Sequence, residues 1–411
     1  MAVGEVEWPN LPAIAGVKLG VAAAGIKYPN RNDVSLVCLD ERATVAGVFT
    51  KNAFIAAPVT VCKRHIEDAR AKGVQPQVLL INSGNANACT GALGYQAAVQ
   101  TCAAIAELAN IQTNQVLPFS TGVIGELLPV EKIIAALPAA YRNISGDAWF
   151  DFAKAIMTTD TRPKGATVTV NVDGHTVSVN GVAKGSGMIN PNMATMLAYV
   201  ATDAAIDVDI LDNISRAAAN KSFNRITIDG DTSTNDACML MATGHSSAPA
   251  LTSRSEPHYQ AIFDAIVSVY KSLAQQVVLD GEGATKFVEI AVGGGATADE
   301  SLAVAYAIAH SPLVKTALYA SDPNWGRIVC AIGYADIEAL DAEKVNVWLD
   351  DVLLVEHGCR AASYSEEQGQ RVLNQAKLLI KVDLGRGNCS ESVWTTDLSH
   401  EYIRINAEYR S

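Results

Sequence analysis

Short apolar runs alternate with polar and glycine-rich turns along the first part of the chain. Residues 34–39, 43–49 and 78–82 are rich in β-branched and other apolar side chains and are bounded by turn residues, which predicts strands. Between residues 95 and 108 the period changes, because apolar side chains recur at the spacing of one helix face. We therefore expect a helix that packs on the sheet formed by these strands.

The sharpest local pattern predicts a hairpin over residues 167–180. Apolar and polar side chains alternate strictly on both sides of the Asp173-Gly174 pair. An Asp-Gly pair between alternating runs favours a two-residue turn, and the alternation implies that one face of the hairpin is buried. The second strand leads directly into a glycine-rich segment that begins at Lys184.

Helical periodicity returns further along the chain. One helix is predicted to begin at Asp207, a candidate N-cap, and apolar residues continue at helical spacing as far as residue 221. The other elements expected from the pattern are helices over residues 257–276 and 302–309 and a strand over 378–384.

Helices mixed with many short strands predict an α/β or α+β protein. The Asp-Gly-Glu-Gly break at 280–283 ends the long apolar helix, so we place the main domain boundary there. A larger domain would span residues 1–280, and a smaller one residues 281–411.

Composition favours a cytoplasmic protein with a large core. The 411 residues are 49% hydrophobic and 18% charged, which is enough to bury a core without disulfides. The net charge of −12 and the lack of a dense basic run argue against nucleic-acid and anionic-membrane surfaces. The start of the chain is acidic and has no signal-peptide pattern, and no run of about 18 apolar residues follows.

Metal and nucleotide motifs do not fit the sequence. The eight cysteines are scattered without zinc-type spacing, as expected of reduced cytosolic thiols, and the histidines form no HExxH, so no metal is expected. Residues 229–236 resemble a calcium loop superficially, but Thr234 replaces its glycine and Leu240 its last glutamate. The remaining glycine clusters match neither a P-loop nor a dinucleotide fingerprint.

The segment KGSGMINPNMATML at 184–197 carries the most chemistry. A glycine-rich turn before an apolar strand is most often a structural turn. If the peptide between Ala194 and Thr195 breaks, however, Thr195 becomes a nucleophile that carries its own base. An N-terminal α-amine has a pKa of about 7.7–8.0 and would lie beside the hydroxyl.

Seven segments, in order, give the chain its resemblance to a known family. Together with the segment around Ala194, they resemble those of the ornithine acetyltransferases, also called glutamate N-acetyltransferases. The segments are NSGNANACTG (82–91), STGVIG (120–125), MTTDT (157–161), DGDTSTND (229–236), DGEGATK (280–286), SDPNWGR (321–327) and INAEY (405–409). The resemblance spans the whole chain. It departs only in details such as Asn190 and Thr396, to which we assign no chemistry.

The family resemblance implies a fold and a catalytic apparatus. The expected fold is a four-layer αββα domain of the self-processing amidase and acetyltransferase type, with a smaller C-terminal α/β domain. Self-cleavage between Ala194 and Thr195 would make Thr195 the nucleophile. Thr121 and Gly122 would form the oxyanion hole through a hydroxyl and an N–H. The two fragments would stay together as a heterodimer that pairs into a heterotetramer.

The resemblance also implies the residues that bind substrate. The charges suit an acetylated amino acid, because Lys184 can pair with its carboxylate and Glu282 with the ammonium of an ornithine side chain. Whether Thr158 or the adjacent Thr159 contacts the substrate stays open. The full set expected to bind substrate is Thr158, Lys184, Thr195, Glu282, Asn406 and Ser411.

The predicted reaction moves an acetyl group from N2-acetylornithine to glutamate through an acetyl-enzyme, without metal or organic cofactor. Some family members also use acetyl-CoA, and the sequence leaves open whether this chain does. One rival is a self-processing aminopeptidase or amidase of the same fold, which gives the acyl group to water. The other is an uncleaved protein that binds acetylated amino acids.

Overall fold

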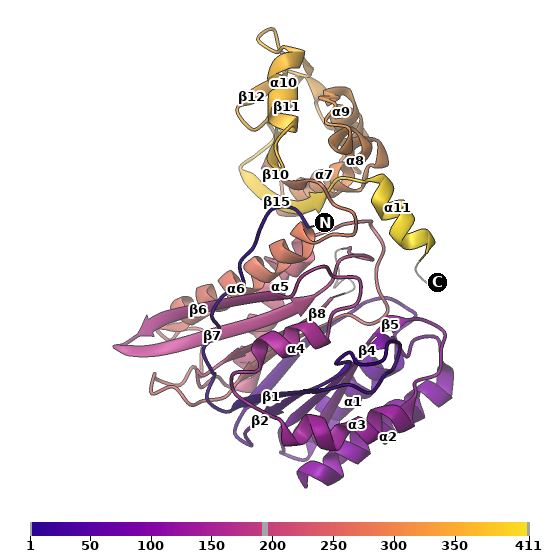
Figure 1. The fold of residues 1–411 in the computed structure, drawn as a ribbon. Coiled ribbons are helices and arrows are strands. Elements are labelled where there is room, and N and C mark those ends of the chain that lie inside the picture. Colours follow the sequence, from indigo (N-terminus) through magenta and orange to yellow (C-terminus); the bar gives the residue numbers. More distant parts are fainter. Residues whose placement is uncertain (1, 191–195, 409–411) are drawn as a thin grey trace.

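The structure is a computed structural model that describes residues 2–190 and 196–408 of the chain. In this part of the chain, the first sheet has four strands in the order β1-β2-β4-β5 (Figure 1). β4 and β5 are parallel, and the other neighbours are antiparallel. The strands are Val17–Ala22 (β1), Val34–Leu39 (β2), Val78–Asn85 (β4) and Val116–Val123 (β5).

Three helices cover the outer face of this first sheet. Ala97 and Cys102 of one helix and Ile133 and Leu137 of another lie in the same buried cluster as Leu80 of β4. The helices are Ala57–Ala71 (α1), Gly91–Ala109 (α2) and Val130–Arg142 (α3).

The second sheet has five strands in the order β3-β9-β8-β7-β6. Every residue of its central strands β8 and β9 is buried, because one face meets the first sheet and the other meets helices. The strands are Thr44–Phe49 (β3), Lys164–Val172 (β6), His175–Lys184 (β7), Leu197–Thr202 (β8) and Ala237–Ala242 (β9). The helices on its outer face are Val208–Asn220 (α5) and Tyr259–Leu279 (α6).

The two sheets pack face to face and share a buried core. Leu79 and Phe119 of the first sheet join Tyr199 and Met239 of the second in one cluster. The Tyr199 ring meets those of Phe119 and Phe152 edge to face, each at 5.4 Å between centroids. Phe152 lies on the short helix α4 (Trp149–Ala155). With helices on both outer faces, the arrangement is the expected four-layer αββα fold.

A third sheet lies beyond α6 in the C-terminal part of the chain (Figure 1). Its strand order is β13-β12-β11-β14-β10-β15, and four helices pack with it around a separate core. The strands are Phe287–Gly295 (β10), Asn346–Leu349 (β11), Val352–Glu356 (β12), Cys359–Arg360 (β13), Lys377–Asp383 (β14) and Cys389–Thr396 (β15). The helices are Ala298–His310 (α7), Pro312–Tyr319 (α8), Trp325–Tyr334 (α9) and Glu366–Leu373 (α10).

The chain then turns back toward the first two sheets through α11 (His400–Ala407). Three short 3-10 helices complete the described elements, at Thr113–Gln115, Phe223–Arg225 and Ala342–Lys344. The third sheet begins at Phe287, seven residues beyond the predicted boundary at residue 280. The division into domains of residues 1–280 and 281–411 stays a prediction.

The local predictions from periodicity are confirmed. The hairpin forms with Val172 opposite His175 around the predicted turn. The predicted helices correspond to α2, α5, α6 and α7, and the predicted late strand to β14. Asp207 does occupy the N-cap position of α5, but its side chain makes no capping hydrogen bond.

Two features of these elements are not visible in the pattern. The strand predicted at 43–49 is β3, and it does not join β2 and β4 in the first sheet. It pairs with β9 in the second sheet. α6 has the length and composition of a membrane span, but 72% of its most apolar stretch is buried inside the protein. It is a core helix that packs on β6 and β7.

Candidate active site

One cavity collects most of the predicted site residues from distant parts of the chain. Its volume is about 260 Å³, and its walls come from β5, the end of β7, the loop before β9 and the C-terminal helix α11. Predicted site residues in its lining are Thr121, Gly122, Thr158, Lys184, Glu282 and Asn406. Ala194, Thr195 and Ser411 lie outside the described residues.

Thr121 and Gly122 lie near the end of β5, where the backbone leaves regular geometry. Gly122 has φ of 135°, and a Cβ there would approach the Gly84 carbonyl carbon of β4 to 2.3 Å. Only glycine fits this position, because both the backbone angle and the close strand exclude a side chain. The Thr121 hydroxyl accepts a hydrogen bond from Lys184 Nζ at 3.2 Å.

Asparagine side chains hold this strand end in place. Asn235 Nδ2, from the loop before β9, donates to the carbonyls of Ala86 at 2.6 Å and Ser120 at 2.9 Å. The Ser120 hydroxyl donates to Asn82 Oδ1 at 2.6 Å. The asparagine-rich segment at 82–91, which begins within β4, and the acidic loop at 229–236 therefore meet beside Thr121.

Lys184 ends β7 with its side chain buried, at 3% exposure. Burial lowers the pKa of its ammonium, and the nearby Asp160 carboxylate opposes that effect. A buried cation at the cavity wall can bind a carboxylate strongly, because little water competes for it.

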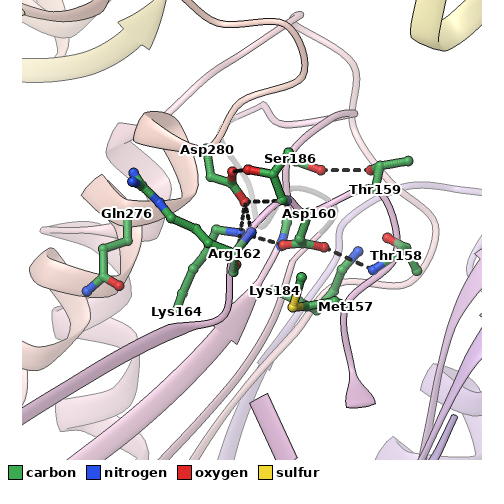
Figure 2. A network of polar contacts seen from close by, with 12 residues as sticks. Met157, Thr158, Thr159, Asp160, Arg162, Lys164, Lys184, Ser186, Gln276 and Asp280 are labelled. Atoms are coloured by element: carbon green, nitrogen blue, oxygen red, sulfur yellow. Dashed lines mark hydrogen bonds and ion pairs between the residues drawn. The ribbon is translucent and has the colours of Figure 1, made fainter. Parts of the chain in front are cut away.

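A buried network of ion pairs holds the segment that follows Lys184 in place (Figure 2). Lys164 Nζ lies 2.5 Å from Asp160 Oδ1 and 2.6 Å from Asp280 Oδ2, and all three side chains are fully buried. Asp160 also accepts the N–H of Gly185 at 2.7 Å and of Thr158 at 3.0 Å. Its burial would raise its pKa, but Lys164, Lys184 and the Gly185 N–H together lower the pKa well below the usual range.

This network joins three segments that line or adjoin the cavity. Asp160 fixes the backbone on either side of it, at Thr158 and Gly185, and Asp280 directly precedes the turn that carries Glu282. This network is not apparent in the sequence. Asp160 is part of a family segment, but nothing in the sequence indicates that Lys164 pairs with Asp280, 116 residues away.

Thr158 and Thr159 both line the cavity, and their contacts differ. The Thr158 backbone N–H is bound by Asp160, whereas the Thr159 hydroxyl lies 2.7 Å from the Ser186 hydroxyl. Figure 2 shows this Thr159 and Ser186 contact beside the ion network. Thr159 therefore already has a partner in the protein for its side chain.

Glu282 and Asn406 meet at the side of the cavity formed by α11. Asn406 Nδ2 donates to Glu282 Oε2 at 2.8 Å, and Glu282 N–H donates to the Ser186 carbonyl at 2.7 Å. Gly187 runs against the carboxylate, where an added Cβ would meet Glu282 Cδ at 2.5 Å. The carboxylate is thus held in place and is suited to bind a cation.

Asp229 fixes the backbone upstream of the predicted cleavage site. Its carboxylate accepts the N–H groups of Met188 at 2.6 Å and Ile189 at 2.8 Å. It also accepts the hydroxyl of Tyr402, from α11, at 3.1 Å. The C-terminal helix and the segment before residue 191 are therefore linked through one side chain.

Asp236 holds the backbone immediately downstream of Thr195. Its Oδ1 accepts the Met196 N–H at 3.1 Å, and the following residue, Ala237, donates to the Met196 carbonyl at 3.2 Å. The side chain is fully buried. Burial raises the pKa of Asp236 well above its usual range, against the opposing effects of Met196 N–H, Ser233 and Lys184.

The buried Asp236 should make stability depend on pH. Because its native pKa is raised, the folded chain keeps a proton that the unfolded chain releases above about pH 3.9, so stability falls as pH rises. Compared with Asp236→Asn, the parent should lose up to about 1.4 kcal/mol per pH unit until the native pKa is passed. Urea unfolding between pH 5 and 8 measures this difference.

Both proteins in that comparison should carry Thr195→Val, so that cleavage does not differ between them. Asp212→Asn, at an exposed ion pair on α5, is the matched control and should show no such slope. A pH-independent difference between Asp236→Asn and its parent would contradict the expectation.

The fold and this cavity define a class: a four-layer αββα protein whose site combines a strand-end hydroxyl and glycine N–H with a buried lysine and an opposing carboxylate. Residues 18–411 match the model of the ArgJ family. The chain belongs to the ArgJ family. It is 53% identical over all 411 residues, and over the full length of each relative, to the arginine biosynthesis bifunctional proteins ArgJ of Pseudomonas syringae pv. tomato and Pseudomonas fluorescens.

Two solved structures are also similar in sequence. The crystal structure of ArgJ from Bacillus halodurans is 40% identical, with a TM-score of 0.48, and the match covers 50% of this chain and 95% of that one. The ornithine acetyltransferase of Mycobacterium tuberculosis, solved in complex with ornithine, is 32% identical with a TM-score of 0.37. That match covers 44% of this chain and 95% of that one.

Proposed function

We propose that this chain cleaves itself between Ala194 and Thr195 and then transfers the acetyl group of N2-acetylornithine to glutamate. The observation that carries the proposal is the cavity itself. It combines Thr121 and Gly122, suited to bind an oxyanion, with Lys184 and Glu282, which have opposite charges suited to an amino acid. Membership of the ArgJ family supports the same reaction.

Self-cleavage would proceed by an N-to-O acyl shift. Thr195 Oγ attacks the Ala194 carbonyl carbon, the hydroxyl proton passes to the leaving nitrogen, and the peptide becomes an ester. Water then hydrolyses the ester and leaves a carboxylate on Ala194 and a free amine and hydroxyl on Thr195. Asp229 and Asp236 support the proposal, since they fix the backbone at 188–189 and at Met196 on either side.

Acetyl transfer would then use the new N-terminus. The Thr195 amine takes the proton of its hydroxyl, and Oγ attacks the acetyl carbonyl of acetylornithine. Thr121 Oγ1 and Gly122 N–H stabilise the oxyanion. The amine returns the proton to the departing nitrogen of ornithine. Glutamate then attacks the acetyl-threonine ester through its neutral α-amine, the Thr195 amine passes the released proton to the departing Oγ, and N-acetylglutamate leaves.

The substrate contacts follow from charge. Lys184 would pair with the α-carboxylate of acetylornithine, and Glu282, oriented by Asn406, with the ammonium of its side chain. Thr158 would donate or accept a hydrogen bond at the same wall, and Thr195 and Ser411 would complete the site. This scheme needs no metal or organic cofactor, and acetyl-CoA as an alternative donor stays an open proposal.

The proposal extends to assembly and location. Fragments of 194 and 217 residues would remain associated as a heterodimer, because β7 and β8, on either side of the cleavage site, pair along their length. Two heterodimers would form a heterotetramer. We place the enzyme in the cytoplasm, where its scattered cysteines would stay reduced.

The first experiment is denaturing electrophoresis with N-terminal sequencing of the purified protein. The proposal expects two bands in place of one of 43.3 kDa, the larger beginning at Thr195. Initial rates at several glutamate concentrations should give parallel double-reciprocal plots. A single uncleaved band would favour a binding protein, and hydrolysis of acetylornithine without transfer would favour an amidase.

A further inference from the structure

A second cavity adjoins the first and has two cationic side chains in its lining. Its volume is about 170 Å³, and it shares Gly122, Val123, Thr158 and Thr159 with the first cavity. Its lining includes Lys27 and Arg31, from the segment between β1 and β2, together with Asp33 and Glu408. The two cavities therefore meet at Gly122, with Lys184 and Glu282 lining the first and Lys27 and Arg31 lining the second.

The proposed reaction poses a charge problem that one cavity does not solve. The donor, acetylornithine, has a cationic side chain, whereas the acceptor, glutamate, has an anionic one. Both must present their α-nitrogen to the same acetyl carbon. Glu282 attracts the ammonium and repels the γ-carboxylate, so the same contact cannot serve both substrates.

We propose that the second cavity is the acceptor subsite, where Lys27 and Arg31 bind the γ-carboxylate of glutamate. The inference rests on the proposed function and adds where the second substrate is recognised. Donor and acceptor would share the α-carboxylate contact at Lys184, and their side chains would diverge on either side of Gly122 and Thr158.

The acidic groups in the second cavity already have partners in the protein. Asp33 accepts the N–H groups of Ala24 and Ile26, both at 2.6 Å. Glu408 accepts a hydrogen bond from Arg404 Nη1 at 2.9 Å. Protein groups thus hold these two carboxylates at the cavity wall, and Lys27 and Arg31 supply the positive charge that attracts an incoming carboxylate.

Both cations are held near the cavity. Arg31 Nη2 donates to the Met157 carbonyl at 2.5 Å, which anchors the guanidinium beside Thr158 and leaves its other N–H groups for a ligand. Lys27 Nζ lies 5.4 Å from the centroid of the Tyr28 ring. The cavity is large enough for a carboxylate with bound water, since one water needs only about 10–15 Å³ of such space.

The test compares the two half-reactions in Lys27→Met and Arg31→Gln. Exchange of label between ornithine and acetylornithine uses only the donor half-reaction and should stay within about twofold of the parent. The KM for glutamate should rise about tenfold or more, the scale of one lost charge-assisted hydrogen bond. The parent should also prefer glutamate to glutamine, and the variants should lose much of that preference.

Lys132→Met is the matched control. Lys132 donates to the Gly25 carbonyl at 2.8 Å in the same region but does not line the cavity, so its KM for glutamate should not change. Unchanged KM for glutamate in both test variants, or equal loss of donor exchange and glutamate transfer, would overturn the proposal. If the parent protein shows no exchange of label between ornithine and acetylornithine, the proposed function itself is wrong.

Discussion

Thr195→Val should remain a single 43.3 kDa chain and should lose acetyl transfer by about a thousandfold or more. Valine has nearly the shape of threonine but no hydroxyl, so it can form neither the ester intermediate of cleavage nor the acetyl-enzyme. Electrophoresis measures the first effect, and N-acetylglutamate formation from acetylornithine and glutamate measures the second. Circular dichroism should show that the variant is folded.

Two companion variants make this result specific to the nucleophile. Thr195→Ser keeps a hydroxyl and should cleave and transfer acetyl, at a lower rate. Thr121→Val removes one oxyanion donor and should lower kcat about 10²–10³-fold, which is the usual effect of losing one such donor. Full transfer activity in Thr195→Val would refute the proposed mechanism.

Lys164→Met should destabilise the protein by about 3–5 kcal/mol. The substitution leaves Asp160 and Asp280 buried without the cation that lies 2.5 and 2.6 Å from them. Both buried carboxylates then lose their nearest cation, and one of them holds the backbone of Thr158 and Gly185. Urea unfolding at pH 7 in the Thr195→Val background measures the loss without interference from cleavage.

The triple variant Lys164→Met, Asp160→Asn, Asp280→Asn separates charge from packing. It removes all three charges, so it should recover part of the stability that Lys164→Met loses. Arg216→Met, which breaks an exposed pair with Asp212, should change stability little. If Lys164→Met proves as mild as Arg216→Met, the network does not stabilise the fold as we expect.

The hairpin and the core helices could be predicted because their signals are local. Strict alternation around Asp173 and Gly174 allows one register, and the structure has it. The apolar positions of α5 and α6 repeat at helical spacing because those faces lie on the second sheet. The αββα arrangement and the site residues came from the family resemblance, since periodicity does not say which strands pair.

Long-range electrostatics and strand pairing could not be predicted from the sequence. β3 lies between β2 and β4 in the chain but pairs with β9 in the other sheet. This pairing is not visible in the sequence, because the two strands are nearly 200 residues apart. The Lys27 and Arg31 cavity was missed because a surface loop with two cations looks like an ordinary solvated segment. Asp236 belongs to a family segment, but only the structure shows that it is buried and accepts the Met196 N–H, next to the predicted cleavage site.

The sequence by itself determined the local elements, the acidic and apolar character of the chain and, through resemblance, its family and the residues expected at the site. Only the tertiary structure decided that Thr121, Lys184 and Glu282 share a cavity, that a second cavity with Lys27 and Arg31 meets it at Gly122, and that Lys164 lies between two carboxylates. The physical reason is range. Side-chain periodicity is set by neighbours a few residues apart, whereas burial and charge pairing depend on segments that meet only after the sheets have packed.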